Sequence, residues 1–301
     1  MGLMGLMVSG VTKKFGENTA VNKLSFSLEE PGVFGLLGTN GAGKTTTIRM
    51  ILGILGKDAG RIEWNGKQVS RESVSFGYLP EERGLYPKIK VGEQLMYFAE
   101  LRGMTVHKAK EVIKYWYERL DVAKYDGMKA EQLSKGNQQK IQFITALLHD
   151  PDLVILDEPL SGLDPVNSDL FKGIISELVE RGKYVVMSSH QMADVEEYCR
   201  DILILVDGIT VLSGNLKSIK RGYGRTNLYI GCEEDIIQRA DGAGINLVNK
   251  TATGYEFKIP NEDSAYAFIR GLMESGVRVD KFEIREPSLH EIFVEKAGER
   301  T

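Results

Sequence analysis

Cysteine is almost absent from this chain. Cys199 and Cys232 are the only two among 301 residues. Their spacing fits no metal-binding motif, and two cysteines are too few for a disulfide framework. The sequence therefore predicts two reduced thiols in a cytosolic protein.

Long hydrophobic runs are absent too. No apolar stretch approaches the roughly 20 residues that a membrane-spanning helix needs. The first ten residues are apolar but lack a basic region and a sustained hydrophobic core, which argues against a signal peptide. We expect a soluble chain, so any role in a membrane would require a second protein.

An excess of charge of either sign is also missing. Lys and Arg total 38 and Asp and Glu total 42, which gives a net charge of -4. This balance provides no overall attraction to nucleic acid or to anionic lipid. The hydrophobic content of 42% and the charged content of 27% are those of an ordinary globular protein, and the length suits two domains.

The order of predicted elements divides the chain into two parts. Up to about residue 215, short apolar strands alternate with helical patterns, which predicts a parallel sheet wrapped by helices. Residues 216–226 are rich in Lys, Arg and Gly, and we interpret them as a linker. Residues 227–284 then follow the order β-α-β-β-α-β, which is the ferredoxin-like pattern.

A glycine-rich loop follows the apolar run Val33–Leu37 and precedes a helical pattern. It matches G-x-x-x-x-G-K-[ST] at every position. The loop consists of Gly38, Thr39, Asn40, Gly41, Ala42, Gly43, Lys44 and Thr45. Glycines let backbone N–H groups approach phosphates, and the helix that follows points its positive end at the same place. Lys44 can reach the β- and γ-phosphates of a nucleotide, the Thr45 hydroxyl can bind Mg²⁺, and Thr46 adds a nearby donor.

Two acidic residues and a histidine follow other predicted strands. Asp157 and Glu158 end the apolar run Leu153–Leu156, and His190 follows the next strand. The carboxyl ends of parallel strands meet at one sheet edge, so these side chains should lie beside the glycine-rich loop. Asp157 then suits Mg²⁺ binding and Glu158 suits a general base for hydrolysis. The alternatives are solvated acids that end a strand and a structural histidine.

These segments together resemble the nucleotide-binding subunit of an ATP-binding cassette (ABC) transporter. Six motifs occur in the family's order: an adenine-stacking aromatic at Phe15, Walker A at Gly38–Thr45, a signature at Leu133–Gln139, Walker B at Leu153–Glu158, a D-loop at Ser161–Asp164, and the switch histidine His190. The family's signature usually reads Leu-Ser-Gly-Gly-Gln. Other phosphate-loop ATPases lack this spacing from signature to Walker B.

The resemblance implies a mechanism that spacing alone does not supply. In the family, two cassettes close head to tail around two ATP molecules. Ser134, Gly136 and Gln138 of one copy would then contact the γ-phosphate held by Lys44 of the other copy. The start of a helix near Gly136 favours an anion, although Ser134 could also act only as a helix cap.

Some positions depart from the family pattern. Lys135 and Asn137 stand in the signature where glycine or other residues are commoner. Glu81 stands where the family has a glutamine that binds Mg²⁺, and we expect Glu81 to take that role. The stretch Pro80–Tyr86 and the tail Glu286–Phe293 resemble bacterial sodium-efflux cassettes of the ABC-2 class, whose permease is a separate chain.

The predicted fold is α/β. We expect a P-loop NTPase core of the ABC type in residues 1–215, with a parallel sheet, an antiparallel β subdomain and a helical subdomain at about 86–135. A linker at 216–226 and a small ferredoxin-like α+β accessory domain at 227–301 complete the prediction.

The resemblance further implies an ATPase that uses ATP and Mg²⁺. It would work as a homodimer that powers a multi-spanning membrane permease. The location would be the cytoplasmic face of a bacterial or archaeal membrane, and the expected direction of transport is export. No nucleic-acid partner is expected. Two alternatives stay open: a cassette that acts on ribosomes or DNA without a permease, and a regulatory cassette that acts on a protease or secretion system.

Overall fold

The computed structural model describes residues 5–70, 73–82 and 84–298. It divides into two compact units, one up to Ser213 and one from Gly214 onward. Arg83, which belongs to the stretch that resembles sodium-efflux cassettes, lies outside the described residues.

A six-stranded sheet forms the centre of the first unit. Its strands lie in the order β10-β9-β3-β8-β7-β6, with bounds β3 (Gly32–Gly38), β6 (Phe76–Leu79), β7 (Leu153–Asp157), β8 (Tyr184–Ser189), β9 (Asp201–Val206) and β10 (Ile209–Asn215). Every pair from β9 to β6 is parallel. Strands β3, β7 and β8 are buried along their whole length, as expected for continuous apolar runs in a parallel sheet.

A four-stranded antiparallel sheet packs against this centre. Its order is β2-β1-β4-β5, with bounds β1 (Leu6–Phe15), β2 (Asn18–Leu28), β4 (Ala59–Trp64) and β5 (Lys67–Gln68). Apolar residues of both sheets form one core with helix α1 (Lys44–Ile51), to which Ile48 and Ile51 contribute. This shared core fixes the direction of the loop between β3 and α1.

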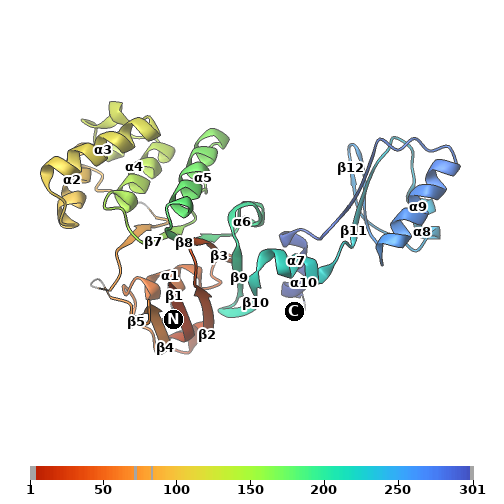
Figure 1. Cartoon of the computed structure of the whole chain (residues 1–301), viewed down its shortest axis with the longest axis horizontal. Coiled ribbons are helices and arrows are strands. Elements are labelled where there is room, and N and C mark those ends of the chain that lie inside the picture. Colours follow the sequence, from red (N-terminus) through yellow and green to blue (C-terminus); the bar gives the residue numbers. More distant parts are fainter. Residues whose placement is uncertain (1–4, 71–72, 83, 299–301) are drawn as a thin grey trace. The chain divides into compact units, whose positions relative to one another are not determined.

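Besides α1, the first unit contains the α-helices α2 (Val91–Leu101), α3 (Val106–Leu120), α4 (Lys135–Leu147), α5 (Pro165–Glu180) and α6 (Met192–Tyr198). Figure 1 shows α2, α3 and α4 gathered on one side of β7 and β8, with the antiparallel sheet on the other side. Side-chain caps begin three of them: Thr105 accepts from the N–H of Lys108, and Ser134 and Asp164 do the same at α4 and α5. None of the helices among the described residues has the length and apolar character needed to cross a membrane.

The second unit contains a four-stranded antiparallel sheet in the order β12-β13-β11-β14. Its elements are β11 (Asn227–Gly231), α8 (Ile237–Gly242), β12 (Asn246–Thr251), β13 (Gly254–Lys258), α9 (Glu262–Glu274), β14 (Lys281–Arg285) and α10 (Leu289–Gly298). Leu228, Ile230, Phe257 and Phe268 belong to its own apolar core. Both the element order and the sheet order confirm the predicted ferredoxin-like fold.

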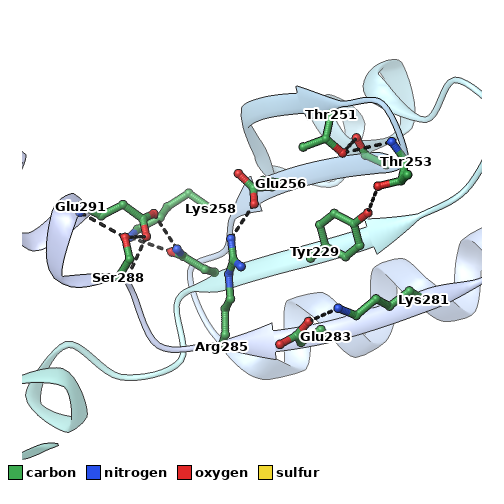
Figure 2. A network of polar contacts seen from close by, with 12 residues as sticks. Tyr229, Thr251, Thr253, Glu256, Lys258, Lys281, Glu283, Arg285, Ser288 and Glu291 are labelled. Atoms are coloured by element: carbon green, nitrogen blue, oxygen red, sulfur yellow. Dashed lines mark hydrogen bonds and ion pairs between the residues drawn. The ribbon is translucent and has the colours of Figure 1, made fainter. Parts of the chain in front are cut away.

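Polar contacts hold α10 to the sheet of this unit (Figure 2). Asn227 is only 4% exposed, and its amide donates to Glu291 Oε1 at 2.6 Å while its carbonyl accepts from Lys258 Nζ at 3.0 Å. Glu291 also accepts from the Ser288 N–H and hydroxyl. Further along the sheet, Arg285 pairs with Glu256 and Lys281 pairs with Glu283. Each charged side chain of this network therefore has an ion-pair or hydrogen-bond partner within the second unit.

The segment 216–226, which we expected to be a linker, is largely helical. Helix α7 spans Leu216–Tyr223 and belongs to the second unit. The Asn215 side chain caps it by accepting from the Ser218 N–H at 3.1 Å, and Gly224 ends it with a φ of 72°. The Lys, Arg and Gly content of this segment suggested a linker, and only Leu216 within the short helix is buried.

Candidate active site

The glycine-rich loop between β3 and α1 borders a cavity of 250 Å³, which is lined by residues 39–46 and Glu81. Gly38, Gly41 and Gly43 have φ angles of 154°, 83° and 104°, which L side chains rarely adopt. A Cβ atom at Gly43 would also lie 2.6 Å from the Ala20 carbonyl oxygen. The loop conformation therefore requires glycine, and it leaves open space where a group could approach the backbone.

Lys44 lies at the end of this loop, where α1 begins, and is 7% exposed. Its ammonium donates to the carbonyl oxygens of Gly38 at 2.8 Å and Thr39 at 3.3 Å. Glu158 Oε1 lies 3.4 Å from the same nitrogen. A buried cation needs such partners, and phosphate oxygens could replace them.

Asp157 ends β7 and is 1% exposed. In the parallel register it lies opposite Ser188 of β8, whose hydroxyl donates to Asp157 Oδ1. Burial raises the pKa of Asp157, while the nearby hydroxyls of Ser188 and Thr45 act to lower it. The other oxygen, Oδ2, is buried and accepts no hydrogen bond from the described residues. A buried carboxylate oxygen without a donor fits a ligand of a hard cation such as Mg²⁺.

Glu158 is 6% exposed and has a φ of 53°, which is unusual for a residue other than glycine. Its backbone N–H donates to the hydroxyl of Ser188 at 3.0 Å and to the Ser188 carbonyl at 3.3 Å. Its side chain lies between two partners, because Oε2 is 2.8 Å from His190 Nδ1 and Oε1 faces Lys44. Such backbone strain clusters at functional sites.

The structure thus brings Lys44, Asp157, Glu158 and His190 together at the carboxyl edge of the sheet, where sequence analysis expected them. Glu81 follows β6 at the same edge, is exposed, and lines the cavity of the glycine-rich loop. Oxygen atoms of Thr45, Glu81 and Asp157 are of the type that Mg²⁺ prefers.

Phe15 ends β1, well before the glycine-rich loop in the chain. The residue is 51% exposed, and the Lys13 ammonium lies 5.5 Å from the ring centre. An exposed aromatic face of this kind can stack on another flat ring.

The signature segment lies at the start of α4. It includes two polar residues, the exposed Ser134 and the half-buried Asn137. The Ser134 hydroxyl accepts from the Asn137 N–H and, at 3.0 Å, from the Asn137 side-chain amide. The same amide donates to the Tyr125 hydroxyl at 2.9 Å. Gly136 lies between them in open space: among the described residues, the nearest neighbour of a Cβ atom placed there would be Leu163 of the D-loop, at 3.9 Å. Ser134, Gly136 and Asn137 therefore form one small surface.

Gln138 does not belong to that surface, contrary to expectation. It is 7% exposed, and its amide donates to the carbonyl oxygens of Ala130 at 2.9 Å and Leu133 at 3.0 Å. The side chain is thus directed inward, where it holds the turn before α4. Asn137 was missed as a candidate, although counting five residues from Leu133 would have placed it at the last position of the signature.

Ser188 was also missed as a candidate. It is fully buried, and its hydroxyl contacts both acidic residues. A serine near the end of an apolar strand, two residues before the predicted histidine, was the available signal.

Comparisons with known proteins cover both units of the chain. A family model described as "ABC transporter" matches residues 21–161. A second, "ATP-binding protein DrrA1-3-like, C-terminal domain", matches residues 214–297.

Two relatives match almost end to end. The ABC transporter ATP-binding protein YhaQ of Bacillus subtilis (strain 168) is 48% identical over 294 residues, which is 97% of this chain and 98% of the relative. Nod factor export ATP-binding protein I of Rhizobium sp. (strain N33) is 30% identical over 312 residues, which covers 99% of this chain and 98% of that protein. A solved structure of an ATP-binding subunit of an ABC transporter superposes with a TM-score of 0.69 and 28% identity, over 73% of this chain and 94% of its own.

Proposed function

The chain belongs to the ABC transporter family of ATP-binding proteins, and on that premise we propose that it drives a separate membrane permease that exports its substrate. ABC cassettes of this family are ATPases, so the reaction is hydrolysis of ATP. The observation that carries the proposal is the meeting of Lys44, Asp157, Glu158 and His190 at one sheet edge.

Within the site, the glycine-rich loop would hold the phosphates. Residues 38–46 supply backbone N–H groups, and the Lys44 ammonium would exchange its two carbonyl partners for phosphate oxygens. Phe15 would stack on the adenine, which its exposed ring allows.

Three oxygen ligands would hold Mg²⁺: the hydroxyl of Thr45 and the carboxylates of Glu81 and Asp157. This set is supported by the place of Glu81 on the loop cavity and by Asp157 Oδ2, which has no hydrogen-bond donor among the described residues. When bound, the ion would neutralise charge on the phosphates.

Glu158 would act as the general base that takes the proton of the attacking water. The His190 ring contacts one oxygen of the Glu158 carboxylate, and Lys44 lies beside the other oxygen. His190 would then keep the base oriented towards the phosphate loop.

A second copy of this chain would complete the site. Ser134, Gly136 and Asn137 form an accessible surface at the start of α4, where backbone N–H groups favour an anion. We replace Gln138 by Asn137 in this role because Gln138 is buried and its amide is already used.

The permease would dock on the helical subdomain of residues 86–135. That region contains a cavity of 890 Å³, to which Met96, Tyr97 and Ile113 contribute. Tyr86 and Leu101, which are 53% and 63% exposed, add apolar surface nearby in the chain. The second unit, with α7 in place of the expected linker, would be an accessory domain at about 214–301.

Export as the direction rests on a relative, since a protein 30% identical along nearly its whole length is named for Nod factor export. The permease would choose the substrate. The cassette would then work at the cytoplasmic face of the membrane.

Purification from native membranes tests this proposal. We expect a tagged chain to recover a multi-spanning protein whose removal abolishes transport-coupled ATP hydrolysis. Recovery of ribosomes, DNA or a protease complex in its place would reject the exporter.

A further inference from the structure

Ser188 is one of the two serines that end the completely buried strand β8, after a run of larger, mostly apolar side chains. It is 0% exposed and follows Met187 in β8. A buried hydroxyl is unfavourable unless it is hydrogen-bonded. Ser188 has two such bonds, because it donates to Asp157 Oδ1 and accepts from the Glu158 N–H at 3.0 Å.

We propose that Ser188 is a positioning residue for ATP hydrolysis, whose single hydroxyl orients Asp157 and Glu158 together. The inference rests on the proposed function, because the two carboxylates are its metal ligand and its base. Ser188 itself is too deeply buried to touch a nucleotide.

The bond to Asp157 fixes the orientation of that carboxylate. Ser188 occupies Oδ1, and Oδ2 stays buried with no donor in the described part of the chain. Without the hydroxyl, the carboxylate plane could rotate about the last side-chain bond, which is a soft torsion. Ser188 therefore fixes the plane of the carboxylate and, with it, the direction of the oxygen that is available for a cation.

The bond to Glu158 acts on the backbone. Glu158 has a φ of 53°, and its N–H is shared between the hydroxyl and the carbonyl of Ser188. A strained conformation persists only where its surroundings hold it. In this conformation the Glu158 side chain reaches both Lys44 and His190.

The neighbouring Ser189 provides a contrast on the same strand. Its hydroxyl contacts the backbone of Gln191, accepting from the N–H at 2.9 Å and donating to the carbonyl at 3.4 Å. Of these two adjacent serines, it is Ser188 whose hydroxyl contacts the acidic pair.

Ser188→Ala tests the inference, with Ser176→Ala as a control that removes an exposed hydroxyl on α5 bonded to the Lys172 carbonyl. Hydrogen bonds to charged groups are worth enough for a tenfold to hundredfold effect. We expect kcat for ATP to fall at least about tenfold in Ser188→Ala. ATP affinity measured by calorimetry in EDTA should stay within about twofold of wild type, while the gain in affinity on adding Mn²⁺ should shrink at least about fivefold.

Ser188→Thr keeps the hydroxyl and should recover most of the lost turnover if it melts like the wild type. The inference is overturned if Ser188→Ala turns over within twofold of wild type, or if it loses ATP affinity in EDTA as strongly as it loses kcat. A folded Ser188→Thr that is as slow as Ser188→Ala would overturn it too. Failure of the proposed function looks different, because wild type and Lys44→Ala would then hydrolyse ATP equally.

Discussion

His190 Nδ1 lies 2.8 Å from one oxygen of Glu158, and the other oxygen of that carboxylate lies 3.4 Å from Lys44 Nζ. The Glu158 carboxylate thus bridges the phosphate loop and the strand-end histidine. Lys44 and Glu158 are buried, whereas the His190 side chain is 44% exposed. Solvent can therefore reach this group of residues through His190.

Glu158→Gln should stop hydrolysis while leaving the nucleotide bound. The amide keeps the size of the side chain but cannot take a proton, so we expect turnover to fall at least about a hundredfold. An ATP-dependent dimer should then accumulate, as measured by size-exclusion chromatography with light scattering. Glu180→Gln, at an exposed position on α5, is the matched control. Unchanged turnover in Glu158→Gln would remove it as the base.

Lys44→Ala should weaken ATP binding at least about a hundredfold, because a buried ammonium aimed into the loop is lost. Calorimetric titration with ATP measures this directly. Lys67→Ala removes an exposed lysine of β5 and should bind ATP like wild type. Residual tight binding in Lys44→Ala would contradict the assignment of the loop.

Asn137→Ala and Gln138→Ala should have different effects although the residues are adjacent. Gln138→Ala removes the buried amide that donates to the carbonyl oxygens of Ala130 and Leu133, so we expect a loss of about 1–3 kcal/mol in the free energy of unfolding. The free energy of unfolding of Asn137→Ala should stay within about 1 kcal/mol of the wild-type value. This variant should nevertheless hydrolyse ATP at least about tenfold more slowly.

Thermal denaturation and ATPase assays on both variants measure this difference. The reverse result, an unstable Asn137→Ala and a stable but slow Gln138→Ala, would restore Gln138 as the nucleotide contact.

His149 should make the fold sensitive to mild acid. Burial, reinforced by the nearby Arg102, lowers its pKa from the ordinary 6.5 to about 4. Between these values the unfolded chain takes up a proton that the folded chain does not, so stability falls as pH falls through this window. The melting temperature of His149→Gln should therefore fall less between pH 7 and pH 5 than that of the wild type.

The control for this measurement is His107→Gln, whose side chain is 87% exposed in the native chain. It should reproduce the wild-type pH dependence. An equal loss of melting temperature in His149→Gln and wild type would show that other groups cause the acid sensitivity.

Local features of this protein were predictable from the sequence. The glycines at Gly41 and Gly43 are needed where φ is positive, and Lys44 begins the helix that follows directly. Asn65-Gly66 likewise forms the hairpin turn between β4 and β5 that an Asn-Gly pair favours. These features depend on consecutive residues, so their chemistry is visible in order along the chain.

Side-chain direction within the signature needed the helix itself. Asn137 and Gln138 are neighbours in sequence, but successive residues of an α-helix point about 100° apart. Asn137 therefore reaches back to Ser134, while Gln138 is turned inward to Ala130. Which of two adjacent amides faces solvent depends on how α4 packs, and the residue types alone do not tell.

The sequence by itself determined the loop, the strand-ending acids and the order of elements, because each rests on local backbone preference or on hydrophobic pattern. Only the tertiary structure decided the role of Ser188. It is 31 residues from Asp157, and the parallel register of β7 and β8 sets the two side by side. A shift of one residue would place Ser189 there and turn the Ser188 hydroxyl to the opposite face, since side chains alternate along a strand.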